Sequence, residues 1–331
     1  MNREGYRWYV GVTHCHTNAS DGKYTLEEIA ERAKKRKLDF LMITDHNVNC
    51  KEFPKVDGIT LIYGAELSKN GGHCNMWGVK DVIDKEDYET CETYEDFLKV
   101  KDKAKERGAV ICMNHPHCKQ CPWRWEKNPE DIDVLEVWNS PTHYDNLECT
   151  DWWHDQLRKG YKLPVVGGSD YHRDYVVTDL LTWPVTYVYA KSNSAEDILD
   201  AIVKGHTTIC FNVGTTFIDI TSGDNIIGDT VKLEKDTTVT INVNKLHRNH
   251  TLIVFGNDGE IFKHTAKKSG KFSITLPVEK SGFICAHVVF PPGFIYSKIH
   301  DYAIASRIPE QKGMDLPPLI FAQSSAIYFE D

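Results

Sequence analysis

Short apolar runs alternate with helical patterns over the first two-thirds of the chain. The apolar runs that predict strands are residues 7–13, 39–44, 60–65, 109–114, 133–138, 163–168 and 181–189. A hydroxyl residue followed three positions later by an acidic residue is the capping-box pattern that begins a helix. Such pairs precede three predicted helices: Thr25 with Glu28, Thr93 with Asp96, and Ser194 with Asp197. Strands and helices in alternation predict a parallel sheet or barrel, and seven strands indicate a slightly short relative of the (β/α)8 barrel.

After about Asn212 the pattern changes to strands without helices. The segments that predict strands here are residues 238–243, 272–278, 285–290 and 326–329. Asn257-Asp258-Gly259 lies between two apolar runs, which is typical of a hairpin turn. We therefore predict an α/β protein with two domains. Residues 1–212 form the barrel, and residues 213–331 form a small all-β, sandwich-like domain.

Composition and charge narrow the kind of partner that the protein binds. The 331 residues carry a formal net charge of −9 and no run of basic residues, which argues against a surface that grips nucleic acid. Residues 1–11 lack the apolar core of a signal peptide, and no apolar stretch reaches membrane-spanning length. We expect a cytoplasmic protein with reduced cysteines and a small-molecule substrate. Cys118 and Cys121 have the spacing of a metal or redox pair, but two free thiols in a loop are the favoured interpretation.

Metal-ligating side chains follow almost every predicted strand of the first domain. His14 and His16 follow the first strand and, being two residues apart, share one face of an extended chain. The donors after the later strands are Asp45, His46, Glu66, His73, His115, Asp170 and His172. Barrel enzymes build their sites at the carboxyl ends of the strands, and Pro116 favours extended geometry at His115. Imidazoles and carboxylates gathered on one rim therefore predict a site for Zn, Mn or Fe.

This set of residues resembles the motif series of the PHP (polymerase and histidinol phosphatase) family. The motifs are His14-Cys-His16-Thr, Ser20-Asp21-Gly22, Thr44-Asp45-His46-Asn47, Glu66, His73, Asn114-His115-Pro116 and Ser169-Asp170-Tyr-His172. Other segments resemble the branch of this family that includes CehA and McbA, namely Gly72-His73-Cys-Asn75, Glu136-Val-Trp-Asn139, Gly167-Gly168-Ser169-Asp170 and the closing β domain. The resemblance covers residues 8–212 and implies a distorted seven-stranded (β/α)7 barrel.

The resemblance also implies two or three divalent ions, with Mn, Fe or Zn as the candidates. The implied ligands are His14, His16, Glu66 and Asp170 for one ion, Glu66 as a bridge with His73 and His115 for a second, and Asp21, His46 and His172 for a third. Some relatives have histidine where Asp21 stands, and its harder carboxylate favours Mn or Fe there. A turn residue is the alternative for Asp21, and a surface histidine is the alternative for His73. Asp45 either orients a ligand histidine or is a surface or capping carboxylate.

These features predict a metal-dependent hydrolase. The carboxylates of Asp21, Glu66 and Asp170 are fewer than the charges of two or three dications, so the bare site is positive and attracts phosphate. The expected reaction is hydrolysis of a small phosphorylated metabolite through a metal-bridging hydroxide. A metal-dependent carboxylic or carbamate ester hydrolase is the alternative, because the branch resembled includes carbaryl hydrolase. A non-catalytic metal-binding module is the third candidate.

Further polar residues near the predicted ligands are candidates for substrate contact. His117 and Arg173 are the catalytic candidates, and Arg173, His206 and His143 are the candidates for substrate binding. Arg173 is favoured because a guanidinium binds phosphate in a bidentate manner. A solvated or salt-bridged side chain is the alternative for each. Trp123 and Trp125 either stack on a flat substrate or pack their own loop.

Overall fold

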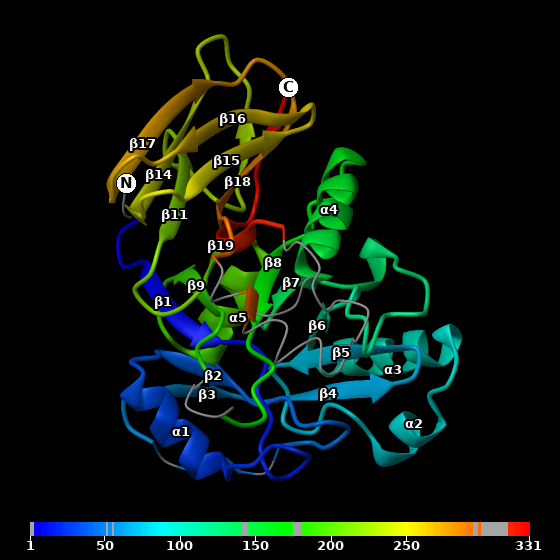
Figure 1. The fold of residues 1–331 in the computed structure, drawn as a ribbon. Coiled ribbons are helices and arrows are strands. Elements are labelled where there is room, and N and C mark those ends of the chain that lie inside the picture. Colours follow the sequence, from blue (N-terminus) through cyan, green and yellow to red (C-terminus); the bar gives the residue numbers. More distant parts are fainter. Residues whose placement is uncertain are drawn as a thin grey trace.

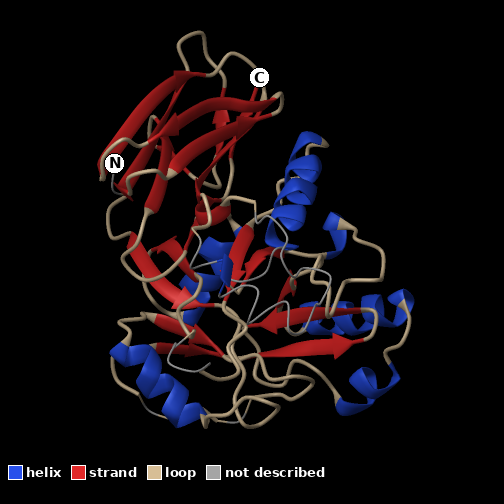
Figure 2. Cartoon of the chain, in the orientation of Figure 1, coloured by secondary structure: helices blue, strands red, loops and turns tan. Residues whose placement is uncertain are grey.

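The computed structural model describes residues 3–50, 52–54, 56–140, 145–174, 180–293, 297–298 and 317–331. Figure 1 shows the helices gathered around the earlier strands, with a strand-rich layer formed by the later part of the chain above them. Figure 2 shows the same division, with one long helix standing beside the strands of the upper layer. Within the described ranges, no helix has the length and apolar character needed to cross a membrane.

The first part of the chain contains ten strands and five α-helices in the described residues. The strands are β1 (Arg7–Val12), β2 (Phe40–Met42), β3 (Thr60–Ile62), β4 (Gly64–Lys69), β5 (Gly72–Trp77), β6 (Val110–Met113), β7 (Val134–Asn139), β8 (Val165–Gly168), β9 (Val185–Ala190) and β10 (Thr207–Cys210). The helices are α1 (Leu26–Lys35), α2 (Lys85–Thr90), α3 (Tyr94–Glu106), α4 (Asp145–Arg158) and α5 (Ala195–Val203), with a 3-10 turn at Pro129–Asp131. Capping boxes at Thr25 and Thr93 begin α1 and α3, which confirms the sequence prediction.

The α/β class is confirmed, but the strands are not all parallel. β1, β2 and β3 pair in parallel, as do β6, β7 and β8. β9 runs antiparallel to β1, and β4, β5 and β6 form an antiparallel meander. The predicted third strand consists of two strands, because β3 ends before Tyr63 and the chain continues as β4. The next strand, β5, was not predicted. A closed seven-stranded barrel stays a prediction.

Apart from two helical residues at 297–298, the regular elements described in the later part of the chain are strands. These are β11 (Phe217–Ser222), β12 (Asn225–Ile226), β13 (Thr230–Lys232), β14 (Thr238–Leu246), β15 (Thr251–Gly256), β16 (Gly259–Thr265), β17 (Gly270–Pro277), β18 (Gly282–Phe290), β19 (Leu319–Ser324) and β20 (Ile327–Glu330). The hairpin predicted at residues 257–259 joins β15 to β16. β19 pairs with both β18 and β10, so one sheet runs from the later strands through β10 and β9 to β1. The division at residue 212 therefore stays a prediction.

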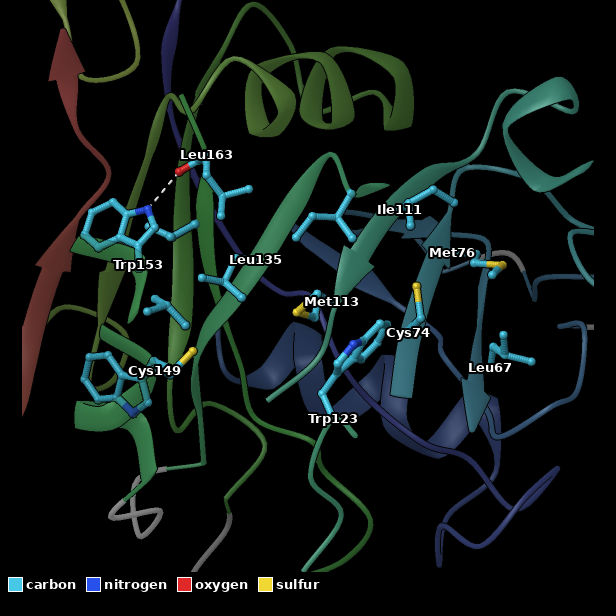
Figure 3. Close-up of a cluster of buried hydrophobic side chains, with 14 of the residues drawn as sticks. Leu67, Cys74, Met76, Ile111, Met113, Trp123, Leu135, Cys149, Trp153 and Leu163 are labelled. Carbon is cyan, nitrogen blue, oxygen red and sulfur yellow. Dashed lines mark hydrogen bonds between the residues drawn. The ribbon is translucent and has the colours of Figure 1, made fainter. Parts of the chain in front are cut away.

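A large buried cluster lies between the β4–β8 sheet and the helices that cover it. Figure 3 shows Leu67, Met76, Ile111, Leu135 and other side chains converging there from successive strands. Trp123 is 2% exposed in this cluster and packs edge-on against Phe97, while Trp125 stacks on the same ring. A Cβ atom at Gly71 or Gly72 would lie within 2.5 Å of these indoles, so the glycines permit their close approach. The two tryptophans therefore pack their loop, which was one of the two interpretations of the sequence.

Candidate metal centre

Glu66, near the start of β4, is the carboxylate around which the predicted ligands gather. Its Oε1 lies 3.4 Å from His14 Nε2, 3.3 Å from His73 Nδ1 and 3.6 Å from His115 Nε2. Its Oε2 lies 2.6 Å from His46 Nδ1. The Glu66 side chain is completely buried, so its charge depends on these neighbours rather than on water. His16 Nε2 lies 3.7 Å from Oε2, so five histidines face one carboxylate.

Asp170, which follows β8, faces a second group of the predicted ligands. Its Oδ1 lies 3.3 Å from His14 Nε2, 3.0 Å from His16 Nε2 and 3.6 Å from His172 Nδ1. His14 Nε2 and His16 Nε2 lie only 3.1 Å apart. The two histidines after β1 therefore share one face, as their spacing predicts.

Asp21 completes a third group on the more open side of the site. Its Oδ1 lies 3.2 Å from His172 Nε2 and 3.7 Å from His46 Nε2, and these atoms with a nitrogen of His16 lie within 4.8 Å of one another. The Asp21 side chain is 55% exposed, whereas His14 and His16 are buried. This group is therefore the part of the site nearest to solvent. All nine predicted ligands belong to one connected cluster.

The loop that carries Asp21 is held by Asp45. Asp45 Oδ1 accepts hydrogen bonds from the Thr17 amide at 2.8 Å and from Ser20 Oγ at 2.7 Å, while Oδ2 accepts one from Thr17 Oγ1 at 2.7 Å. The carboxylate is 1% exposed. Of the two roles considered for Asp45, the structure places it in the capping one. It fixes the chain between His16 and Asp21.

The hydrogen bonds of His14 and His172 leave one nitrogen of each ring available to bind a cation. His14 Nδ1 donates to Glu136 Oε1 at 2.9 Å, and His172 Nδ1 donates to the Asp170 carbonyl oxygen at 2.8 Å. In the neutral rings, each Nε2 therefore carries a lone pair. The His14 lone pair faces His16 Nε2 and the carboxylate oxygens of Glu66 and Asp170, which are all able to accept. A set of acceptors that face one point fits a metal ion. Histidine ligands commonly donate a hydrogen bond through the N–H of their other ring nitrogen, as His14 and His172 do here.

The electrostatics of the cluster also favour positive charge at its centre. Burial opposes protonation of His14, but Glu136, Asp170 and Glu66 outweigh it and raise the pKa of His14 well above its usual value. Burial likewise opposes ionisation of Glu66 and Asp170, yet the surrounding imidazoles hold the pKa of both carboxyls well below the usual range. Protons bound here without metal lie where a cation would replace them.

Glu136 is a site residue to which the sequence reasoning assigned no role. It lies in the middle of β7, whose six residues are all buried. Its two oxygens accept hydrogen bonds from His14, the His115 amide and Asn139 Nδ2. A Cβ atom at Gly168 would lie 1.9 Å from Glu136 Oε1, so a glycine is needed there. A carboxylate within the otherwise apolar run of residues 134–138 was the signal that could have identified Glu136.

Cys121 is a second residue that the sequence interpretation left outside the site. Its Sγ lies 3.7 Å from His115 Nδ1 and 3.3 Å from Cys118 Sγ. The sulfur and the ring nitrogens of His73 and His115 lie within 4.8 Å of one another. The loop returns to the β4–β5 turn, where Arg124 and Trp125 donate backbone hydrogen bonds to the Gly71 carbonyl. The spacing to Cys118 correctly indicated one neighbour of Cys121, and the fold adds His115 as a second.

Two of the predicted ligands have unusual backbone conformations. His115 has φ of 29° and Asp170 has φ of 49°, a region that residues with a side chain rarely adopt. The extended geometry that Pro116 predicted for His115 is therefore wrong. The Cys118 amide donates to the His115 carbonyl at 2.9 Å, so the chain turns at once after this histidine. Such conformations are characteristic of functional sites that hold a side chain in one direction.

The remaining candidates lie at different distances from the cluster. Arg173 is exposed and directly follows His172, which belongs to the group at Asp21. His117 is directed to α4, where its ring lies 6.2 Å from that of Trp152, and burial lowers its pKa to about 4. His206 is placed elsewhere: its Nε2 pairs with Asp229 at 3.0 Å next to Arg3. The structure thus places His206 in a hydrogen bond with Asp229, and its role in substrate binding stays a prediction. His143 lies outside the described residues.

The chain is similar to several known proteins. Residues 13–150 match the family model of the PHP domain. A two-domain protein from Bacteroides vulgatus, containing a predicted PHP-like metal-dependent phosphoesterase, is 18% identical, with 87% of this chain and 92% of that one covered and a TM-score of 0.53. A proposed metal-dependent phosphoesterase from Bifidobacterium adolescentis is 17% identical, with 51% and 90% covered and a TM-score of 0.36. An amidohydrolase from Chromobacterium violaceum, solved with bound sulfate and no metal, is 14% identical, with 49% and 87% covered and a TM-score of 0.32.

No curated protein matches the chain. The domain match nevertheless confirms the family resemblance that the sequence motifs predicted. The matched segment holds seven of the nine predicted ligands, and Asp170 and His172 lie beyond it. The match and the donor cluster together support a metal-dependent hydrolase.

Proposed function

We propose that this chain, which carries a PHP domain over residues 13–150, hydrolyses phosphate esters of small molecules with the help of two or three divalent ions. The observation that carries the proposal is the convergence of imidazole and carboxylate acceptors on Glu66 and Asp170. In the described residues, ring nitrogens of six histidines lie within 3.7 Å of a carboxylate oxygen of Glu66 or Asp170. Imidazole and carboxylate together are the ligands preferred by Zn, Mn and Fe.

The residues divide into three overlapping ligand groups. His14, His16, Glu66 and Asp170 would hold the first ion, Glu66, His73 and His115 the second, and Asp21, His46 and His172 the third. Ions bound there would supply Lewis acidity toward a phosphoryl oxygen and lower the pKa of a water molecule. Cys121 lies beside the second group, and a thiolate ligand would favour zinc there over manganese.

The charge of the buried groups makes the third ion important for binding an anion. Glu136 joins Glu66, Asp170 and Asp21 as a fourth carboxylate near the cluster. Four carboxylates balance two dications, so the site becomes positive only when a third ion binds. The third group, at Asp21, is also the most exposed one, where an entering phosphate would first meet the protein. We infer that affinity for phosphate depends on the third ion.

Arg173 is the residue that we propose to bind the phosphate oxygens. It is exposed, and it directly follows His172 on the open side of the cluster. A guanidinium can offer two parallel hydrogen bonds to a phosphate, which would orient the ester toward the ligand groups. The Asp21 and Arg173 segments thus flank the approach to the buried histidines.

Two features of the fold belong to the same proposal. We infer that the strands and helices up to about residue 212 form the distorted (β/α)7 barrel, and that residues 213–331 form a separate all-β domain. The structural support is the parallel pairing within β1–β3 and within β6–β8, together with the all-strand composition of β11–β20. The comparison with a two-domain protein that covers 87% of the chain is consistent with this division.

The test combines metal analysis with an assay of phosphate release. The purified chain would be loaded with Mn, Fe or Zn, the bound metal counted, and a panel of phosphorylated metabolites, aryl phosphates, aryl esters and carbamates assayed. We expect phosphate release that falls at least about 100-fold in Glu66→Gln. Asp236→Asn, an exposed turn residue, is the control and should retain full activity.

The panel separates the candidate reactions. Release of phosphate by the wild type and the control variant, but not by Glu66→Gln, would support the phosphoesterase. Turnover of carboxylic or carbamate esters alone would keep the metal centre and refute the substrate class. Absence of both metal binding and hydrolysis would refute the proposal as a whole.

A further inference from the structure

A second group of metal-binding side chains lies where α4 meets the later strands. His154 Nε2 lies 3.4 Å from Cys285 Sγ, and the ring of His154 stacks on that of His287 with centroids 5.0 Å apart. The candidate ligand atoms of His154, Cys285 and His287 all lie within 4.8 Å of one another. The three residues are 3%, 0% and 4% exposed. None of the three lies in the segment that matches the PHP domain, and none belongs to the cluster around Glu66.

A buried amide lies next to this group. Gln323 of β19 is the direct antiparallel partner of His287 on β18, so their side chains lie on the same face of the sheet. Cys285, two residues before His287, shares that face. Gln323 is 0% exposed. The group therefore has a fourth polar side chain within reach, and that side chain comes from a third element of the fold.

Several atoms of these side chains have no protein partner in the described parts of the chain. They are His287 Nε2 together with Gln323 Oε1 and Nε2. Buried polar groups are nearly always hydrogen-bonded, so two neighbouring side chains with free atoms are unusual. A cation would accept the lone pairs of both His287 and Gln323. The cluster thus has both a suitable set of donors and a reason to bind an ion.

We propose that His154, Cys285 and His287 form a buried site for a thiophilic transition-metal ion, with the Gln323 oxygen as the fourth ligand. Two imidazoles and a thiolate are ligands that zinc and copper prefer, and Mn or Mg does not. The 3.4 Å between the His154 nitrogen and the Cys285 sulfur suits two atoms bound to one ion, since such bonds are about 2.0 Å and 2.3 Å long.

Charge distinguishes the two candidate ions. One thiolate leaves a divalent ion with a net positive charge in a buried place, and Arg158 of α4 adds further positive charge nearby. The same thiolate neutralises monovalent copper. Burying a net charge is unfavourable, so the site should hold Cu⁺ more readily than Zn²⁺. In either case the ion joins α4 to β18 and β19 and stabilises the contact between the two parts of the chain.

The first test leaves the buried group intact. The full chain carrying Cys121→Ser, which removes the thiol beside the active-site histidines, would be loaded with Co²⁺. We expect a thiolate-to-cobalt charge-transfer absorption, because Cys285 still supplies a sulfur ligand. Absence of that absorption would overturn the proposal, and it would do so whether or not the proposed phosphoesterase activity is found.

The second test assigns the signal and identifies the ion. Cys285→Ala is compared with Cys149→Ala. Cys149 is a buried cysteine of α4 and does not belong to the group of His154, Cys285 and His287 (Figure 3). We expect wild type and Cys149→Ala to bind one more Cu⁺ or Zn²⁺ per chain than Cys285→Ala, and to gain thermal stability from that ion. Competition between the two metals shows which one the site prefers. Equal metal content and equal melting temperature shifts in wild type and Cys285→Ala would overturn the proposal.

Discussion

Replacing Glu136 by glutamine tests the proposed centre through a residue that is not itself one of the nine ligands. Glu136 Oε1 accepts from His14 Nδ1 at 2.9 Å, and Oε2 accepts from the His115 amide at 3.2 Å and from Asn139 Nδ2 at 3.1 Å. Glutamine has nearly the same shape but converts one acceptor into an N–H donor. If the amide oxygen serves His115 and Asn139, the new N–H group faces His14 Nδ1. The His14 proton then moves to Nε2, and the ring can no longer bind an ion through that atom.

The opposite orientation of the glutamine amide would lose more hydrogen bonds. Its N–H group would face two donors, and both would lose their partner. Residues that orient a ligand histidine contribute about 10- to 100-fold to metal affinity, which is about 1.4 to 2.7 kcal/mol. We therefore expect the first ion to bind Glu136→Gln about 10- to 100-fold more weakly than wild type.

Competition with a chromophoric chelator measures this difference directly. The matched control is Glu148→Gln on α4, whose carboxylate is 45% exposed and pairs with Lys119 at 2.6 Å. The control should bind metal like the wild type. Equal affinity in Glu136→Gln and wild type would refute the reasoning, because His14 would then not depend on Glu136 for its protonation.

Three further changes test other parts of the structure. Gly168→Ala places a methyl group 1.9 Å from Glu136 Oε1, so this variant should also bind less metal. Gly270→Ala, where the added methyl group meets open space, is the control, and equal metal content in the two variants would contradict the prediction. In metal-free protein, Glu66 raises the pKa of buried His115 to about 9, so the stability that this proton contributes is present below about pH 6.5 and is lost as the pH rises through 9. Thermal melts in chelator should fall over that range in wild type and less steeply in His115→Asn, where His14 still has a raised pKa, and a pH-independent wild type would refute it. Trp123→Ala should lower the free energy of unfolding by about 3–5 kcal/mol in urea, and a loss below about 1 kcal/mol would show that the indole is not a core residue.

Much of the local structure follows from short-range signals in the sequence. The capping boxes at Thr25 and Thr93 begin helices where predicted, and the Asn257-Asp258-Gly259 turn joins two strands. The predicted ligands come together because most of them lie at strand ends, where the neighbouring strands direct them to one rim. Such features depend on a few consecutive residues, so they are readable without knowledge of the fold.

The parts that were missed depend on contacts between distant segments. Nothing near Cys121 in the sequence indicates that its loop folds back onto the turn at Gly71, and that return places the thiol beside His115. The antiparallel β5 was missed because the chain reverses within two residues after β4, where a loop had been expected. Glu136 was given no role because its partners, His14 and His115, come from other strands.

The pairing of β10 with β19 has a consequence for how the protein is made on the ribosome. β10 is synthesised long before β19, and until β19 emerges its edge has unpaired backbone groups on that side. The same sheet continues through β9 to β1, the strand that leads into His14 and His16. Nascent chains that stall before β19 should therefore expose the unpaired edge of β10 and bind chaperones, whereas in full-length chains β19 pairs with this edge.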